Sequence, residues 1–386
     1  MNLINKKNQN NITTIYILRF PLFEKIKNIH TYIYGGLEYT SYTFKILNFK
    51  FYTTKKTLEL SNPEFLSKNL ENLLNQSNQK QWNQNFYMQD VIGKYLAENN
   101  THEKILKLCE NLDNESKALV FRILTRLKNF QTNPKYQIKY TKEEKQDLEK
   151  LQNEFFPNIL PISKGIFGWN GYFLPIKQFE ISVFWHKHAM HTFSNQTLEK
   201  IKNKNIIDVG GFIGDSAIIF EKEFTNQNVY SFEAVSKNYD LMLKTLELNN
   251  SKRIIPVKNA LGSKEEKLQI SISGYSSSLK HSESNSNHEE VEVITLDSYI
   301  EKNPMEIGFI KVDIEGFEQE FLKGAINTIK TQKPAMLISI YHNPNDFFDI
   351  KPLIESWNLG YKFKIYRPID FYVSLETALY CEVEKD

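Results

Sequence analysis

A cluster of glycines and small polar residues follows the short apolar run 206–209. Glycine adopts backbone conformations that other residues avoid, so a strand–turn–helix segment of this kind can bring the main chain close to a ligand. The segment predicts a cofactor site at the carboxyl end of a strand. The residues expected to bind the cofactor there are Gly210, Gly211, Gly214, Asp215 and Ser216.

The acidic residue in this run indicates the charge of the cofactor. Asp208 lies two residues before the first glycine, and the glycine spacing is not the G-x-G-x-x-G of dinucleotide-binding proteins. A carboxylate would repel a pyrophosphate, whereas it would attract the ammonium and sulfonium groups of S-adenosylmethionine. Asp208 therefore favours S-adenosylmethionine as the cofactor.

Two further polar residues follow the next two predicted strands. Glu233 is placed to accept hydrogen bonds from both ribose hydroxyls of the cofactor, although nicotinamide enzymes place an acid in the same position. Asn259 is placed to contact the adenine edge or, alternatively, to cap a turn.

Asp313 and His342 are the candidate catalytic residues. Asp313 follows the fourth predicted strand and is expected beside the methyl-bearing sulfur; the alternative is that it only caps the helix that begins near Glu318. His342 follows the fifth strand and could act as the general base for an acceptor hydroxyl, or be a structural, hydrogen-bonded histidine. Asp313 is also assigned to the cofactor site.

The elements that must position these residues are short apolar strands that alternate with helical stretches. Helical periodicity covers 238–248 and 318–329. Uninterrupted apolar strands separated by helices predict an α/β fold with a parallel sheet covered by helices on both faces. The predicted strands are 206–209, 229–232, 254–257, 309–312 and 336–340.

The length of 386 residues predicts more than one structural unit. Residues 1–60 form a β-rich pattern with many aromatic and β-branched residues. Residues 61–165 have apolar residues at helical spacing, and residues 166–386 contain the strand–helix alternation and the candidate site.

The charge balance of the chain excludes a basic footprint for nucleic acid as the main partner. Lys and Arg number 48 against 46 Asp and Glu, for a net charge of +2. The first residues lack the apolar core of a signal peptide, and no apolar run is long enough to span a bilayer, so a cytoplasmic protein is expected. Cys109 and Cys381 are expected to be buried thiols.

No metal site is expected from the sequence. His186, His188 and His191 lie close together, but a zinc site would need further ligands and none is near them in the sequence. A divalent ion that bridges Asp313, Glu315 and the acceptor lacks an obvious full set of ligands.

Several blocks of residues 166–386 together resemble the FkbM family of methyltransferases. The Lys-x-Asp-x-Glu-Gly block at 311–316, followed by Leu-Lys-Gly-Ala at 322–325, is the most specific part of the resemblance. One departure is Ala234, followed by Val235, where the family commonly has a proline after the acid. The other blocks are 208–216, 232–234, 259–262 and 293–297.

The resemblance implies a class I methyltransferase (Rossmann-like) fold and S-adenosylmethionine-dependent O-methylation, often of sugars or glycan precursors. The expected acceptor is a sugar hydroxyl of a bacterial surface glycan, such as capsule or lipopolysaccharide, or a sugar-nucleotide precursor, with peripheral contacts to a membrane or to glycan-assembly enzymes. The alternatives are a nicotinamide-dependent oxidoreductase on the same topology and a non-catalytic methyltransferase-like scaffold in glycan assembly.

Overall fold

The computed structural model describes strands within residues 4–56, and residues 89–133, 136–273, 276–278 and 287–383. It divides into two compact units, Met1–Asn83 with Phe156–Gln178 and Gln84–Phe155 with Phe179–Asp386. This grouping differs from the expected division at residues 60 and 165, which stays a prediction. Residues 61–88 of the expected helical segment lie outside the described part.

The first unit consists of antiparallel strands. One sheet has the order β1-β2-β3-β5-β4, with β6 paired to β5, and a second sheet has the order β7-β8-β9. The strands are β1 (Ile4–Gln9), β2 (Ile12–Ile17), β3 (Phe20–Ile26), β4 (Thr31–Tyr34), β5 (Leu37–Ile46), β6 (Phe49–Lys56), β7 (Leu160–Ser163), β8 (Ile166–Trp169) and β9 (Tyr172–Leu174).

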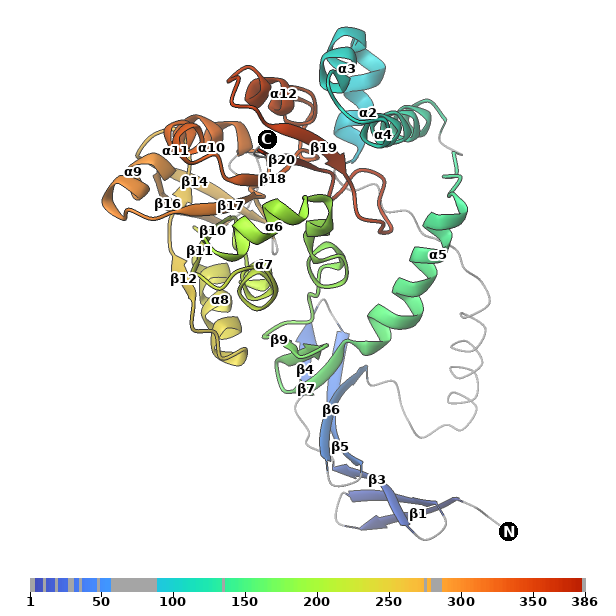
Figure 1. The fold of residues 1–386 in the computed structure, drawn as a ribbon. Helices are drawn as coiled ribbons and strands as arrows, with labels where there is room; N and C mark the ends of the chain where they lie inside the picture. Colours follow the sequence, from blue (N-terminus) through green and yellow to red (C-terminus); the bar gives the residue numbers. More distant parts are fainter. Residues whose placement is uncertain are drawn as a thin grey trace. The chain divides into compact units, whose positions relative to one another are not determined.

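The second unit is built on a sheet with the strand order β12-β11-β10-β17-β18-β20-β19 (Figure 1). The first five strands in this order are parallel, and β20 is antiparallel to its neighbours β18 and β19. The predicted parallel α/β sheet is confirmed. The strands are β10 (Asn205–Val209), β11 (Val229–Phe232), β12 (Ile254–Val257), β17 (Ile307–Val312), β18 (Ala335–Ser339), β19 (Lys362–Tyr366) and β20 (Ala378–Glu382).

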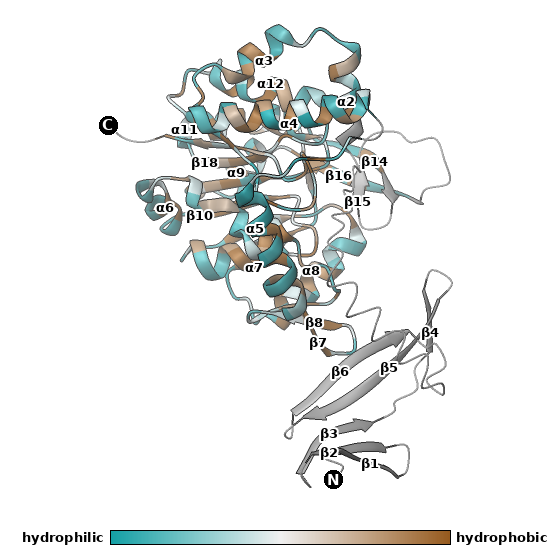
Figure 2. Ribbon diagram, turned by 90° about the vertical axis from the view of Figure 1, so that its right-hand side faces the viewer, coloured by the Kyte–Doolittle hydropathy of each residue, from teal (hydrophilic) through white to brown (hydrophobic). Residues whose placement is uncertain are grey.

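Helices cover both faces of this sheet, so its central strands are buried on both sides. All residues of β17 and β18 are buried, as expected for inner parallel strands, and the hydropathy colouring shows apolar strands between more polar helices (Figure 2). Figure 1 shows α10, α11 and α12 over one face and α6 and α7 over the other. Helix α6 (Asn195–Lys202) precedes β10, the first strand of this sheet along the chain. The helices after β10 are α7 (Asp215–Ile219), α8 (Ser236–Leu248), α9 (Leu296–Lys302), α10 (Glu318–Gly324), α11 (Ile326–Gln332) and α12 (Pro344–Glu355).

Shorter elements complete the unit. A small sheet has the order β13-β16-β14-β15. Its strands are β13 (Ala260–Leu261), β14 (Glu266–Ser273), β15 (Ser276–Ser278) and β16 (Asn287–Ile294). The short 3-10 and π helices of this unit are η1 (Leu151–Phe155), η3 (Ile181–Trp185), η4 (Lys187–Thr192) and η5 (Phe220–Phe224). One more, η2 (Phe156–Asn158), belongs to the first unit.

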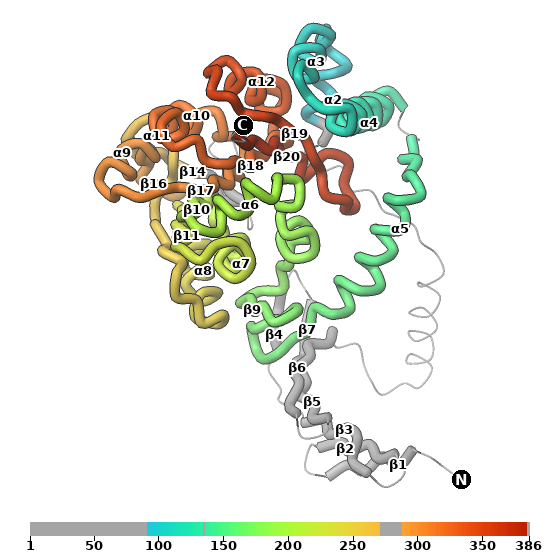
Figure 3. Tube along the Cα trace, in the orientation of Figure 1, coloured from blue at the N-terminus to red at the C-terminus, as the bar shows by residue number. Residues whose placement is uncertain are grey.

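An early helical layer packs on the far end of the sheet. It consists of α2 (Gln89–Glu98), α3 (His102–Cys109) and α4 (Asn114–Thr132), while α5 (Lys142–Lys150) follows it. Figure 3 shows these early helices beside α12 and β19, close to the end of the chain. Their buried apolar side chains include Leu108, Ile123 and Leu127 and belong to the same core as Phe363 and Ile365 of β19.

The edge of the sheet at which the parallel strands end is called the carboxyl edge here. At this edge, β10 is followed by residues 210–214, β11 by Glu233, β12 by Lys258, β17 by Asp313 and β18 by Ile340. No helix among the described residues is both long and apolar enough to cross a bilayer. Cys109 and Cys381 are free and buried, as expected.

Candidate functional site

The glycines of the loop 210–214 lie against the protein's own chain. A Cβ on Gly210 would lie 1.9 Å from the carbonyl oxygen of Asp313, and one on Gly211 would lie 2.1 Å from Oγ of Ser231. Gly210 and Gly214 also have φ angles of +79° and +81°, which are strained for residues with a Cβ. The packing of the protein therefore explains these glycines, and their contact with a cofactor stays a prediction.

Asp208 is buried inside the sheet and paired with a lysine. Its side chain is fully buried, Oδ1 lies 3.2 Å from Nζ of Lys311, and Oδ2 accepts a 2.7 Å hydrogen bond from Ser231 Oγ. Lys311 Nζ also donates to the carbonyl oxygen of Gly210 at 2.7 Å. Burial opposes the charge of Lys311, but Asp208 and the carboxylates of Asp313 and Asp215 raise its pKa. Lys311 compensates the charge of this carboxylate, and direct attraction of a cationic cofactor by Asp208 stays a prediction.

Glu233 lies at the carboxyl edge, directly after β11. Its Oε2 accepts a 3.0 Å hydrogen bond from the Phe212 N–H, and its Oε1 accepts a 2.7 Å hydrogen bond from the Val235 N–H. Burial raises the pKa of Glu233 to about 7. Each carboxylate oxygen keeps a second lone pair, so this fixed carboxylate can still accept hydroxyl donors from a ligand.

Asp215 and Ser216 begin α7, as predicted, and both are buried. Asp215 Oδ1 accepts a hydrogen bond from the Ser216 N–H at 2.9 Å, while Ser216 Oγ lies 3.0 Å from Nε2 of His188. Burial is the main cause that raises the pKa of Asp215 to about 7 and lowers that of His188 to about 3. His188 is therefore a neutral partner of Ser216.

Asn259 is only half-buried and has a loose contact. Its Nδ2 lies 3.5 Å from the carbonyl oxygen of Glu292, which is at the long limit of a hydrogen bond. The structure leaves its amide able to turn toward a ligand, and the adenine contact stays a prediction.

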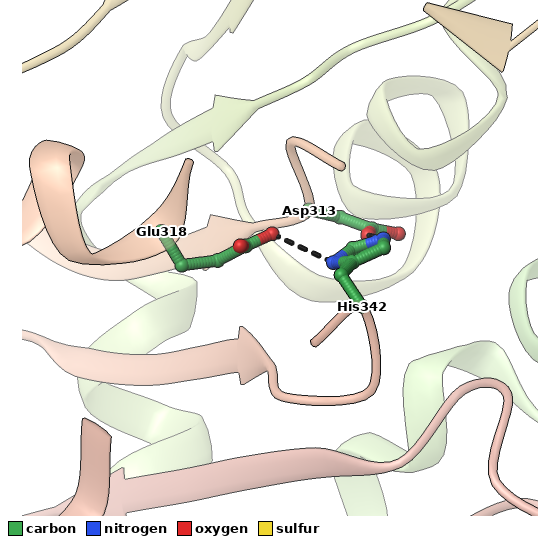
Figure 4. A group of neighbouring side chains, drawn as sticks. All are labelled: Asp313, Glu318 and His342. Atoms are coloured by element: carbon green, nitrogen blue, oxygen red, sulfur yellow. Dashed lines mark ion pairs between the residues drawn. The ribbon is translucent and has the colours of Figure 1, made fainter. Parts of the chain in front are cut away.

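Asp313 and His342 are brought together at the carboxyl edge, as the strand order requires. His342 Nε2 lies 3.4 Å from Asp313 Oδ1 and 3.8 Å from Glu315 Oε2. On the other side of the ring, Nδ1 lies 2.9 Å from Oε1 of Glu318, and Figure 4 shows the imidazole between the two carboxylates of Glu318 and Asp313. Tyr341 donates a 3.3 Å hydrogen bond from its hydroxyl to Asp313 Oδ1.

The carboxylates around His342 disfavour its expected role as a base, which stays a prediction. Burial alone would lower the pKa of its ring, but the carboxylates of Glu318, Asp313 and Glu315 raise it to about 10. These carboxylates favour the protonated ring near pH 7, and the ring would have to lose this proton before it could act as a base. Sequence reasoning missed Glu318 because its role depends on how α10 packs against the loop after β18.

The carboxyl edge carries more acid than base. Burial, followed by the carboxylates of Asp313 and Glu180, raises the pKa of Glu376 to about 8. Burial likewise raises the pKa of Glu315 to about 7. Buried carboxylates whose ionised forms are unfavourable would be stabilised by a bound cation. The site therefore suits a positively charged ligand.

A separate pocket of 430 Å³ lies away from this site. It is lined by residues where β19 begins and β20 ends, including Lys362, Phe363 and Glu382, and by Asn111 and Thr192. No candidate site residue lines it.

When the seven strands of the second unit's sheet are numbered along the chain from β10, their order in the sheet is 3-2-1-4-5-7-6, and the seventh, β20, is antiparallel to its neighbours. This order defines a class I methyltransferase fold of the Rossmann-like type. Residues 208–363 match the family described as Methyltransferase FkbM domain. The resemblance of this region to the FkbM methyltransferases, which the sequence blocks predict, is confirmed.

One curated relative and several solved structures are similar to this chain. Hexuronic acid methyltransferase AglP of Haloferax volcanii is 27% identical over 183 residues, which cover 46% of this chain and 72% of AglP. The structure of methyltransferase FkbM from Methylobacillus flagellatus KT is 19% identical with a TM-score of 0.46, and covers 73% of this chain and 58% of its own. The structure of M. jannaschii TYW2 in complex with AdoMet is 13% identical with a TM-score of 0.30, and covers 56% of this chain and 82% of its own.

Proposed function

We propose that the chain is an S-adenosylmethionine-dependent O-methyltransferase that acts on a sugar hydroxyl of a surface glycan or of its precursor. The observation that carries the proposal is the acidic carboxyl edge of a class I methyltransferase sheet, within the region that matches the FkbM methyltransferase domain. The name of the relative AglP, a hexuronic acid methyltransferase, supports a sugar acceptor. A bacterial capsule or lipopolysaccharide building block is the acceptor expected from the sequence.

The residues present fit a cationic methyl donor. Glu233 and Asp215 are buried carboxylates with pKa values raised to about 7 by burial, so a ligand with ammonium and sulfonium groups would stabilise their ionised forms. A dinucleotide would instead bring its pyrophosphate near these groups, which disfavours the oxidoreductase alternative. S-adenosylmethionine, when bound, supplies an electrophilic methyl group on a good leaving group.

The protein's own residues then have two tasks. Glu233, which two backbone N–H groups hold in place, would accept hydrogen bonds from the ribose hydroxyls. Asp313, whose side chain is 28% exposed, is open to the acceptor side, where alignment of the two reactants supplies much of the rate enhancement. With a protonated His342, the acceptor proton would leave to another group.

A binding experiment tests the donor. Titration of the full chain with S-adenosylmethionine, S-adenosylhomocysteine and NADH in a calorimeter should give heat with the first two and none with NADH. The Glu233→Gln variant should bind the donor at least about tenfold more weakly, while Glu306→Gln, a change at an exposed position before β17, should bind normally. Binding of NADH alone would overturn the proposal.

A cellular experiment tests the acceptor. Surface glycans from cells with and without the protein are compared by mass spectrometry, and the proposal expects the loss of one methyl group per repeating unit. Unchanged glycans in cells that lack the protein, together with donor binding in vitro, would contradict a glycan acceptor.

A further inference from the structure

Three side chains at the carboxyl edge direct potential metal ligands toward one another. They are Asp313 and Glu315 from the loop after β17, and His342 from the loop after β18. From His342 Nε2, the distances are 3.4 Å to Asp313 Oδ1 and 3.8 Å to Glu315 Oε2. Neighbouring ligands of one divalent ion, each bound at about 2.1 Å, lie roughly 3 Å apart, so both carboxylate oxygens lie close to that spacing from Nε2.

Glu318 fixes the orientation of the imidazole. Its Oε1 lies 2.9 Å from Nδ1 of His342 and also accepts a 3.0 Å hydrogen bond from the Ile314 N–H. Glu318 is fully buried, so its carboxylate has little freedom to move. A carboxylate that holds one ring nitrogen while the other faces the ligand site is the usual arrangement behind a metal-binding histidine.

The histidine itself gives an independent indication of a ligand. The side chain of His342 is only 3% exposed, and neither ring nitrogen forms a hydrogen bond of normal geometry in the described structure. Buried polar atoms in proteins nearly always have such partners. The Nε2 atom faces Asp313 and Glu315 at ion-pair distances of 3.4 and 3.8 Å, without a hydrogen bond of normal geometry, so a cation between the three groups would satisfy it.

The backbone of the loop supports the same geometry. Glu315 has a φ angle of +56°, which is strained for a residue with a Cβ, and Gly316 follows it with a φ angle of +97°. At this turn, Oε2 of Glu315 lies 3.8 Å from Nε2 of His342. Strain of this kind concentrates at ligand-binding positions.

We propose that Asp313, Glu315 and Nε2 of His342 bind a divalent cation such as Mn²⁺ or Mg²⁺, with Glu318 as the positioning residue of the imidazole. Only a neutral imidazole has a lone pair for a metal, so the cation would displace the proton of Nε2, which would leave to solvent. The two carboxylates suit Mn²⁺ and Mg²⁺, and the single imidazole favours Mn²⁺ over Mg²⁺, which prefers oxygen ligands. Three protein ligands leave further coordination positions open. This site goes beyond the proposed function, because cation binding does not require methyl transfer.

The site would have a consequence for the reaction, and this consequence alone rests on the proposed function. A cation next to Asp313 would offer its open positions to oxygen atoms of the acceptor. A bound hydroxyl has a lower pKa than a free one, so its proton could leave without a strong base. This would account for a site in which the buried histidine is not available as a base.

Direct binding of Mn²⁺ tests the proposal without any methyl donor. The full chain, treated first with EDTA, is titrated with MnCl₂, and free Mn²⁺ is measured by electron paramagnetic resonance. One Mn²⁺ per chain is expected, with displacement by excess Mg²⁺. Asp313→Asn and Glu315→Gln should each weaken binding by at least about tenfold, and Glu318→Gln by about 10–100-fold.

The matched control is Glu306→Gln, which makes the same chemical change at the other end of β17 and should leave Mn²⁺ binding intact. Far-ultraviolet circular dichroism confirms that each variant is folded; Glu315→Gln changes a side chain that is 31% exposed and keeps the test valid if Asp313→Asn is unfolded. No Mn²⁺ binding by the wild type, or equal binding by wild type and Glu315→Gln, overturns the proposal. Failure to bind S-adenosylmethionine would overturn the proposed function alone.

Discussion

The ammonium of Lys311 lies 3.2 Å from Oδ1 of Asp208, and both side chains are buried at the centre of the sheet. The two residues are neighbours in register on the adjacent parallel strands β17 and β10. Lys311 also donates to the carbonyl oxygen of Gly210. The pair therefore joins β10 and β17 next to the loop 210–214.

Removal of one member of this pair should be strongly destabilising. Lys311→Met leaves the buried Asp208 carboxylate without its cation, and we expect a loss of about 3–5 kcal/mol in the free energy of unfolding. Urea denaturation measures it. The double variant Lys311→Met, Asp208→Asn should recover part of the loss, because no buried charge remains unpaired.

The control for this prediction is an exposed pair. Lys204 lies 3.1 Å from Glu306, whose side chain is 78% exposed, so Lys204→Met should change the free energy of unfolding by no more than about 1 kcal/mol. A similar effect of Lys311→Met and Lys204→Met would show that burial does not make the Asp208 pair important.

The ring of His342 should remain protonated at a pH where an ordinary histidine is neutral. Burial lowers its pKa, but the carboxylates, with Glu318 the largest contributor, raise it to about 10. In EDTA-treated protein with ¹³C-labelled histidine, the His342 signal should therefore not titrate between pH 5.5 and about 8.5. Glu318→Gln should move its titration toward 6.5. A wild-type titration near 6.5 would contradict the prediction.

Gly210→Ala should prevent stable folding or cost more than about 3 kcal/mol. The alanine would have to adopt the positive φ angle of this position, and its Cβ would lie 1.9 Å from the carbonyl oxygen of Asp313. Gly360→Ala is the matched control, since Gly360 has a φ angle of +82° but no atom within 4 Å of an added Cβ. It should cost only about 1–2 kcal/mol. Equal thermal stability of the two variants would show that the contact with Asp313 is unimportant.

Glu233 should make the ligand-free protein less stable as the pH rises. Burial raises its pKa to about 7 in the folded state, above its ordinary value near 4.3. Relative to the unfolded chain, the folded state therefore loses up to about 3 kcal/mol as the pH rises from about 4.5 to 7. Across this range, Glu233→Gln should gain stability relative to the wild type, as measured by urea denaturation. A constant difference between the two proteins would contradict the raised pKa.

The strands of the fold could be predicted because each is a short, nearly uninterrupted apolar run. Five of the predicted runs correspond to β10, β11, β12, β17 and β18. The predicted helix 318–329 is instead divided at Ala325 into α10 and α11. The local pattern does not contain this break, because apolar residues continue on both sides of it.

The chemistry of the site was harder to predict, because it depends on pairs from different strands. Neutralisation of Asp208 by Lys311 follows from the order of β10 and β17, and the charge of His342 follows from the position of Glu318. Candidate residues could be identified one by one after each strand, but their protonation states depend on neighbours more than 20 residues away in the sequence.

The hydrogen bond that Ser116 of α4 accepts from the backbone N–H of Ile365, at 2.9 Å, lies on the outermost strand of the sheet, β19. An outer strand with unsatisfied amides can recruit a strand from another molecule and start aggregation. The early helices occupy this position and bury Phe363 and Ile365 beneath them. A fragment that begins after α4 but keeps β19 and β20 would lose this cover, and we expect it to aggregate in recombinant expression more readily than the full chain.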